Sequence, residues 1–495
     1  MVIGIEQASL PMEGALPPDL QGTLFRIGPR WPWAEPSAEP GSGPDADGTG
    51  GAAGDRGSGP EPGPGPGAPD GNGGAGHGVP LGALHAVEFR DGLAVSYRWG
   101  ESDADADVFW HSGSVLALAE TGLPSQYSRL LEPQEFAGAL TVPVASHVPR
   151  VAADGSRVLF AVDDGLGTAE RPAGLVRPGE ELDGIWLRLG EWDAHGALRG
   201  AQAVELERAT WQHDVAVTSG HVVFIESPTT RLEDPAGVRV PFAWVPGAEA
   251  WLGVVPRSGD GTQVRWFRLD PCLVTHVLGA WEDEASGDIV MYVCRYDALE
   301  AGRPFDPAQS VVGPPGVGLT SIGGCLGVLE RWRLAGDRVE RSQVDDRYVE
   351  YPRRDAHLEG APFRYGYSLE EEWAEPGSAA DAWHDAAVDR HAVLDRSCAP
   401  VGLLKFDLSR DEVTAWRPGP GRRPSEPLFV RSVEGRSDDE GWLLSVVDDV
   451  NRGTSDIYVL DASSMGRRGP EAVVHLPVRL PLHSHGEWVP ADRYR

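Results

Sequence analysis

Histidines that recur in similar strand-and-turn settings are the residues of this chain with the clearest chemical potential. Five of them are His147, His213, His276, His483 and His485. Neutral imidazole is a common ligand for transition metals, so several imidazoles that meet at one point can hold a metal ion. A single histidine is more often a surface or hydrogen-bonded core side chain. The interpretation therefore depends on whether the fold brings these positions together.

The spacing of the histidines fits a repeated unit. His213 follows His147 by 66 residues, His276 follows His213 by 63, and His485 follows His276 by 209, close to three such steps. A four-stranded propeller blade with generous loops occupies roughly 65 residues, and equivalent strands of successive blades face one axis. The spacing can bring four side chains to one point, but it does not by itself single out four among 14 histidines.

Short β-rich segments bounded by turn residues make up most of the chain. Strand-like alternation occupies residues 23–27 and resumes at Ala83. Further segments carry Gly or Asp at a turn, flanked by β-branched or aromatic residues; they begin at Ala152, Val217, Ser286, Ala335 and Glu440. Helical periodicity is scarce, and helices are predicted only over 125–140 (SQYSRLLEPQEFAGAL) and 369–374 (LEEEWA). The pattern predicts an all-β propeller or another repeated sheet fold.

Residues 35–78 differ abruptly in composition, because Gly, Pro, Ala and Asp dominate them. Such a segment buries too little apolar area to offset its ordering entropy. We expect a disordered surface insertion inside a single propeller domain that spans 1–495. The remainder has room for about seven blades of the size given above.

The bulk composition excludes several classes of protein. A formal net charge of −32 disfavours a nucleic-acid partner. The four cysteines have no CxxC spacing and are expected to be structural thiols. We find no signal peptide and no apolar run of about 18 residues, so we expect a cytoplasmic protein without a transmembrane segment. No clear amphipathic anchor is present, although transient membrane contact remains compatible with the sequence.

Several blocks of sequence, in this order along almost the whole chain outside the insertion, resemble the carotenoid cleavage oxygenase family, which also includes stilbene-cleaving dioxygenases. The blocks are LPPDLQGTLFRIGP (16–29), ALAETGLP (117–124), SHVPRVAADG (146–155), HDVAVTSGHVVF (213–224), WLGVVPR (251–257), PCLVTHVLGAWED (271–283), VEYPRRD (349–355), SEPLFV (425–430) and LPLHSHGEW (480–488). The resemblance implies a seven-bladed β-propeller, a helical and loop cap over one face, and a ferrous ion, Fe(2+), on the axis.

The same resemblance implies the site residues. The iron ligands would be His147, His213, His276 and His485, because Pro481 and Gly486 select His485 over His483. Three carboxylates would hold these ligands: Glu120, Glu350 and Glu426. Such partners accept the second N–H of a ligating imidazole and offset the charge of the metal. Ala106 stands where some relatives carry a threonine that partly blocks an iron position, which predicts a more open, iron-proximal position here.

The resemblance implies a dioxygenase that uses O₂ to cleave one double bond of a carotenoid or apocarotenoid into two carbonyl fragments. No catalytic residue beyond the metal centre and no organic cofactor is required. Cleavage of a stilbene or phenylpropanoid alkene is disfavoured by Ala119, where stilbene-cleaving members carry lysine. A non-catalytic propeller that binds a lipid or protein partner is the third alternative. Five tryptophans near the ligand blocks are candidates for lining a substrate tunnel, with core packing the commoner role of each: Trp110, Trp211, Trp244, Trp281 and Trp488.

Overall fold

The computed structural model describes residues 7–29, 82–119, 121–122, 124–135, 144–145, 147, 150–151, 156–163, 184–232, 242–297, 304–305, 327–373, 398–482 and 484–494. Within these ranges the chain forms antiparallel β-sheets, and its helical structure is limited to the short 3₁₀ helices η1 (Ala356–Leu358) and η3 (Ala491–Tyr494). The all-β prediction is therefore confirmed. Among the described residues, no helix is long and apolar enough to cross a membrane.

The first four large sheets follow the order of the chain, apart from one strand that comes from its far end. The first sheet contains β1 (Gln7–Ala8), β5 (Leu93–Ser102), β4 (Gly82–Arg90), β3 (Gly22–Pro29) and β35 (Gly486–Pro490). The second contains β10 (Pro133–Gln134), β9 (Ser125–Tyr127), β7 (Ser114–Leu118) and β6 (Asp107–His111). The third contains β12 (Arg150–Val151), β13 (Arg157–Asp163), β14 (Ile185–Trp192) and β15 (Leu198–Leu206). The fourth contains β16 (Ala216–Val217), β17 (His221–Glu226), β20 (Ala250–Pro256) and β21 (Arg265–Leu269).

The second half of the chain forms two larger sheets. One contains β22 (Leu273–Glu282), β23 (Ile289–Tyr296), β25 (Val328–Ala335), β26 (Arg338–Arg353), β27 (Tyr365–Trp373), β28 (Cys398–Asp407) and β29 (Glu412–Trp416). The other contains β2 (Met12–Gly14), β34 (Ala472–His475), β33 (Thr454–Asp461), β32 (Gly441–Asp449) and β30 (Arg422–Pro424), with β31 (Leu428–Arg431) also paired to β32. Two small sheets complete the set: β8 (Thr121–Gly122) with β11 (Val144–Ala145), and β18 (Thr229–Arg231), β19 (Phe242–Trp244) and β24 (Pro304–Phe305).

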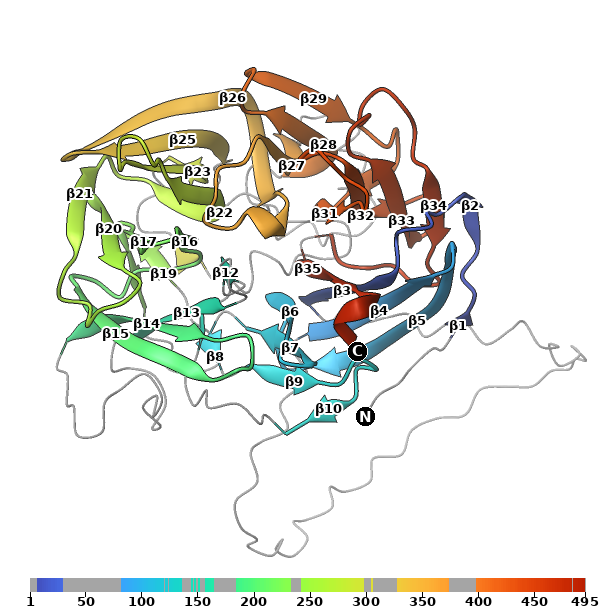
Figure 1. The fold of residues 1–495 in the computed structure, drawn as a ribbon, viewed down its shortest axis with the longest axis horizontal. Helices are drawn as coiled ribbons and strands as arrows, with labels where there is room; N and C mark the ends of the chain where they lie inside the picture. Colours follow the sequence, from blue (N-terminus) through green and yellow to red (C-terminus); the bar gives the residue numbers. More distant parts are fainter. Residues whose placement is uncertain are drawn as a thin grey trace, which may run out of the picture.

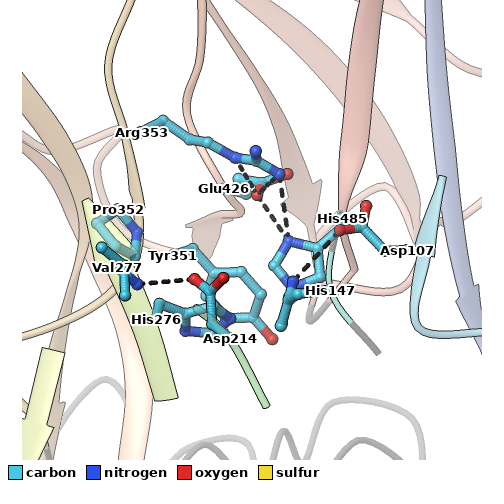
Figure 2. A pocket seen from close by; sticks show the side chains of 10 residues that line it. All are labelled: Asp107, His147, Asp214, His276, Val277, Tyr351, Pro352, Arg353, Glu426 and His485. Atoms are coloured by element: carbon cyan, nitrogen blue, oxygen red, sulfur yellow. Dashed lines mark hydrogen bonds and ion pairs between the residues drawn. The ribbon is translucent and has the colours of Figure 1, made fainter. Parts of the chain in front are cut away.

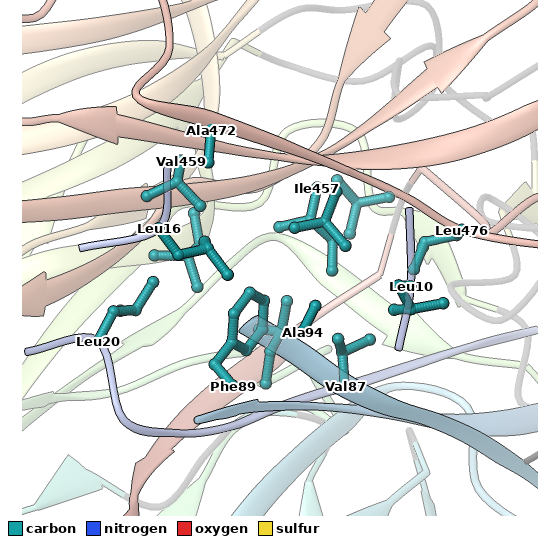
Figure 3. Close-up of a cluster of buried hydrophobic side chains, with 14 of the residues drawn as sticks. Leu10, Leu16, Leu20, Val87, Phe89, Ala94, Ile457, Val459, Ala472 and Leu476 are labelled. Carbon is teal, nitrogen blue, oxygen red and sulfur yellow. The ribbon is translucent and has the colours of Figure 1, made fainter. Parts of the chain in front are cut away.

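The two ends of the described chain are exchanged between the first and last large sheets. Strand β2 pairs with β34 in the last sheet, while β35 pairs with β3 in the first. In Figure 1 the sheets succeed one another around the molecule, so that the blue and red ends of the colour scale meet. One apolar cluster packs the two sheets together. It includes Leu16, Val87 and Phe89 from the first part of the chain and Ile457 and Val459 from the last part, and all five are at most 5% exposed (Figure 3).

The strands predicted from turn-bounded segments are confirmed, but the two predicted helices are wrong. Residues 369–374 begin inside β27, which pairs on one edge with β26 and on the other with β28. There Leu369 is fully buried, and Glu370 is buried in an ion pair with Arg417. Tertiary pairing and burial thus override the helix propensity of the glutamate run. Within 125–140 the described residues form β9 and β10, which pair with each other.

Two other expectations from composition concern the cysteines and the insertion. Cys272 and Cys294 are buried free thiols, as expected for structural cysteines. The insertion predicted over 35–78 lies outside the described residues.

Candidate metal centre

Four histidine side chains from distant parts of the chain lie against one another. They are His147, His213 just before β16, His276 in β22, and His485 just before β35. The ring centroid of His147 lies 4.2, 4.6 and 4.5 Å from those of the other three, in that order. His276 lies 5.1 Å from His213 and 5.3 Å from His485, again between centroids. The fold therefore brings together the four imidazoles that the family resemblance selected.

A pocket opens beside His147, His276 and His485 and is lined mainly by polar groups. Figure 2 shows its lining residues: Asp107, His147, Asp214, His276, Val277, Tyr351, Pro352, Arg353, Glu426 and His485. They come from two of the large sheets, through β6, β22 and β26, and from loops that precede or connect other strands. No one local segment can build such a pocket, so its shape depends on how the sheets are arranged.

His276 enters the pocket because its strand is irregular. The pairing of β22 with β23 shifts register between Val274 and Val277, a stretch that contains His276. A β-bulge re-aims a side chain in this way. The Nδ1 atom of His276 contacts the Glu350 carboxylate, which also accepts hydrogen bonds from the Thr275 hydroxyl (2.6 Å) and the Tyr296 hydroxyl.

Glu350 and Tyr351 lie at a second irregularity, in β26. Pairing with β27 shifts register between Glu350 and Arg353, and Tyr351 has a φ of 53°. This left-handed conformation costs a non-glycine residue on the order of 1 kcal/mol or more. It is stabilised by the Tyr351 N–H, which donates to the Glu350 carboxylate at 3.1 Å. As a result the Tyr351 ring lies 5.2 Å from that of His276 and 4.9 Å from that of His485.

His485 is held by Glu426, whose carboxylate is fully buried between β30 and β31. One carboxylate oxygen accepts hydrogen bonds from His485 Nδ1 (2.8 Å) and Arg353 Nε (2.6 Å). The other accepts from the Gly486 N–H and from Arg26 Nη1, both at 3.0 Å. A Cβ atom at Gly486 would lie 2.5 Å from the Phe25 carbonyl, so this position requires glycine for β35 to approach β3.

Burial and the neighbouring groups shift the pKa of each of the two glutamates in opposite directions. Burial raises the pKa of the Glu426 carboxyl, but Arg353, His485 and Arg26 outweigh it and lower the pKa to about 2. For Glu350, burial is likewise outweighed by His276, Thr275 and Tyr296, and its pKa is also lowered to about 2. Burial lowers the pKa of His485 to about 4, against the opposing effect of Glu426. At neutral pH the site therefore combines ionised carboxylates with a neutral imidazole at His485.

The nitrogen atoms of the cluster lie close enough together that they could hold a metal ion. Ligand nitrogens of His147, His276 and His485 all lie within 4.8 Å of one another, and the Nε2 atoms of His147 and His213 are 2.8 Å apart. A metal about 2.1 Å from each imidazole nitrogen would separate adjacent ligand atoms by about 3 Å and opposite ones by about 4.2 Å. His276 Nε2 is buried and finds no hydrogen-bond partner within the described part of the chain. Such a nitrogen suits a lone pair that faces a cation.

Of the remaining residues selected from the sequence, two lie outside the described ranges and two are described. Glu120 and His483 lie outside the described residues. Ala106, half-buried, directly precedes β6, and its N–H donates to the Leu118 carbonyl; its proximity to iron stays a prediction. Ala119 is half-buried and packs against the apolar cluster around Val108 and Val115.

The five tryptophans are packing residues in the described structure. None of them lines the described pocket in Figure 2. Trp211 comes nearest, with its ring 4.5 Å from that of His213, and it belongs with Trp244 to a buried aromatic cluster. Trp110, Trp281 and Trp488 pack against three other core clusters.

Sequence reasoning missed four polar residues of the pocket. Asp107 contacts His147, and Asp214 accepts a hydrogen bond from the Val277 N–H at 2.8 Å. Tyr351 and Arg353 both follow Glu350 within the block VEYPRRD, so their closeness to a selected residue was the available signal. Asp214 had the same signal, because it directly follows His213.

Comparison with known proteins places this geometry in a family. The family model described as retinal pigment epithelial membrane protein matches residues 80–490. The chain belongs to the carotenoid cleavage oxygenase family. The family has the propeller fold and depends on non-haem iron, and the buried histidine cluster fits a metal site of that kind.

The similar proteins of known name include one named for isoeugenol and one named for carotenoids. An isoeugenol monooxygenase from Pseudomonas nitroreducens is 26% identical over 396 residues, which cover 78% of this chain and 75% of the relative. A carotenoid cleavage oxygenase from Mycobacterium tuberculosis is 26% identical over 479 residues, covering 82% and 86%.

Solved structures agree in fold. Pseudomonas brassicacearum lignostilbene dioxygenase is 21% identical with a TM-score of 0.70, covering 99% of this chain and 96% of that one. A variant of Synechocystis apocarotenoid oxygenase gives the same TM-score and coverage at 19% identity. At these identities the similarity concerns the fold alone.

Proposed function

We propose that this member of the carotenoid cleavage oxygenase family is a non-haem Fe(II) dioxygenase that cleaves an alkene double bond of a carotenoid or apocarotenoid. The observation that carries the proposal is the cluster of His147, His213, His276 and His485, with ring centroids 4.2 to 5.3 Å apart wherever two of them are in contact. The set is all nitrogen, without a thiolate, which suits iron(II). Four ligands leave positions of a six-coordinate ion for other molecules.

The chemistry supplied at this site when iron(II) is bound is activation of dioxygen beside an electron-rich double bond, which is cleaved into two carbonyl fragments. The chain itself orients the ligands. Glu350 and Glu426 accept the Nδ1–H of His276 and His485, so the Nε2 lone pairs point into the pocket. Their negative charge also offsets that of the cation.

Three less polar groups shape the pocket around the histidines. Val277, Pro352 and the ring of Tyr351 contribute apolar surface to its lining. An apolar polyene offers few hydrogen-bonding groups, so its position would follow from the shape of such surfaces. We expect regioselectivity to depend on the Tyr351 ring, which lies beside two of the four histidines.

We also propose seven blades for the propeller. The first part of β26 pairs with β25 and its last residues pair with β27, so a division at this strand splits the seven-stranded sheet into two blades. The five other sheets of four or more strands supply one blade each. The two small sheets, β8 with β11 and β18 with β19 and β24, are candidates for the cap over one face.

Cleavage of a phenylpropanoid or stilbene alkene is the second candidate. Similarity to isoeugenol monooxygenase over 78% of the chain favours it. Ala119 counts against a phenol held by lysine at that position, as in stilbene-cleaving members. A direct comparison of the two classes of alkene distinguishes these candidates.

Metal analysis after anaerobic loading with Fe(II) tests the proposal first. We expect about one iron per chain, and a chain that takes up no iron would overturn the proposal. The loaded protein is then incubated under ¹⁸O₂ with apocarotenals, isoeugenol and hydroxystilbenes, and aldehydes are detected by mass spectrometry. Labelled aldehyde from apocarotenals supports the first candidate, and labelled aldehyde only from the phenolic alkenes supports the second.

A further inference from the structure

His147 has a carboxylate partner that the family resemblance does not supply. Its Nδ1 atom lies 3.3 Å from Oδ2 of Asp107, and both side chains are buried (Figure 2). Asp107 is the first residue of β6 and is fully shielded from solvent, whereas His147 lies 40 residues further along the chain. The contact therefore joins two segments that only the fold brings together.

The second carboxylate oxygen of Asp107 fixes the orientation of the side chain. Oδ1 accepts the Val108 N–H at 2.7 Å, and pairing of Asp107 with Leu118 holds the strand in register. Oδ2 is thereby directed at the imidazole. A carboxylate accepts hydrogen bonds only, so this contact requires the proton of His147 to be on Nδ1.

That tautomer determines what His147 presents to the other histidines. With Nδ1 protonated, the neutral ring carries its lone pair on Nε2, which lies 2.8 Å from His213 Nε2. The arrangement repeats the one seen at His276 with Glu350 and at His485 with Glu426. Three imidazoles of the cluster thus have a carboxylate at Nδ1, each from a different sheet or loop.

We propose that Asp107 is a positioning residue for the metal centre, which fixes His147 as a ligand through Nε2 and adds a further negative charge beside the cation. This inference rests on the proposed function, since it assigns a role within the same site. Asp107 acts through its contact with His147.

Asp107→Asn is the direct test because it keeps the size of the side chain. In one orientation its amide N–H₂ faces His147 Nδ1–H, and in the other it faces the Val108 N–H. Either way two donors oppose each other and one hydrogen bond is lost. Removal of such a partner typically lowers metal affinity 10- to 100-fold.

The measurement is titration with Co(II) against a competing chelator, with the visible d–d spectrum recorded at saturation. We expect Asp107→Asn to bind Co(II) roughly 10- to 100-fold more weakly and with a shifted spectrum. The matched control is Asp456→Asn, which removes a buried carboxylate from His475 Nδ1 (2.8 Å) outside the pocket. It should leave affinity and spectrum unchanged.

The outcomes separate this inference from the proposed function. Wild-type affinity and spectrum in Asp107→Asn would overturn the role of Asp107 while metal binding stands. A wild-type protein that binds no Co(II) or Fe(II) would overturn both. If Asp107→Asn does not fold, ¹⁵N-histidine spectra of the wild-type protein, assigned with His147→Gln, decide the question: Nδ1 protonation of His147 is expected, and Nε2 protonation would contradict the inference.

Discussion

Glu426→Gln is the perturbation for which the structure predicts the largest combined effect on stability and metal binding. Four donors converge on the carboxylate: His485 Nδ1 and Arg353 Nε on one oxygen, and Arg26 Nη1 and the Gly486 N–H on the other. Glutamine must turn its N–H₂ toward one of these pairs, so two donors lose their acceptor in either orientation. The two arginines also lose their buried counter-charge.

The magnitude follows from the burial of these groups. The Arg26 side chain is 4% exposed and the Glu426 side chain is fully buried, so water cannot replace the lost carboxylate at Arg26. Breaking a buried pair in this way costs about 3 kcal/mol or more of folding free energy. Because His485 also loses its partner, we expect metal affinity to fall about 10- to 100-fold.

Urea unfolding of the metal-free protein and Co(II) titration measure the two effects separately. Glu370→Gln is the matched control, because Glu370 is equally buried but its partner Arg417 is 52% exposed and can be solvated. That variant should lose about 1 kcal/mol and retain metal affinity. Unchanged urea stability and unchanged Co(II) affinity in Glu426→Gln would refute the electrostatic account of this site.

Three further predictions concern the ligands, the pH dependence and the insertion. His213→Ala should lower iron occupancy and abolish turnover, and a wild-type rate would remove His213 from the ligand set. In the metal-free protein His485 has a folded-state pKa of about 4, below its usual 6.5. It therefore contributes folding stability that is complete above about pH 6.5 and is lost as the pH falls toward 4. Urea titrations at stepped pH should show this loss, and His485→Gln should reduce it. Deletion of 35–78 should leave the thermal midpoint unchanged, because its composition predicts little burial, and loss of soluble protein would contradict the disorder prediction.

The sequence contained enough information to predict the β architecture, because turn residues and β-branched runs act locally. It also led, through family blocks, to residues that the structure finds in contact, such as Glu350 with His276 and Glu426 with His485. Their roles as ligands and ligand partners remain predictions for the metal titrations. The partners of β2 and β35 in the last and first sheets were not predicted, since each pairing joins residues more than 450 positions apart.

Asp107 was the pocket residue hardest to identify from the sequence. It ends the acidic run DADAD in a chain with 75 acidic residues, where a solvated charge is the ordinary expectation. It is fully buried and contacts His147, 40 residues further along the chain, and no local pattern reports that contact. The helix prediction over 369–374 was wrong for a similar reason. Glu370 pairs with Arg417, which directly follows β29 and is distant in the sequence.

The exchange of the end strands has a consequence for biosynthesis. On the ribosome β3 is made early, and one of its edges stays bare until β35 has emerged, after all the intervening sheets. Bare strand edges are where nascent chains associate wrongly, so this interval is the period in which a chaperone would be most valuable. The imidazole of His485 directly precedes β35, so this nitrogen donor arrives at the very step that covers the edge of β3. Metal capture would then report that β35 has paired with β3 in a nascent chain.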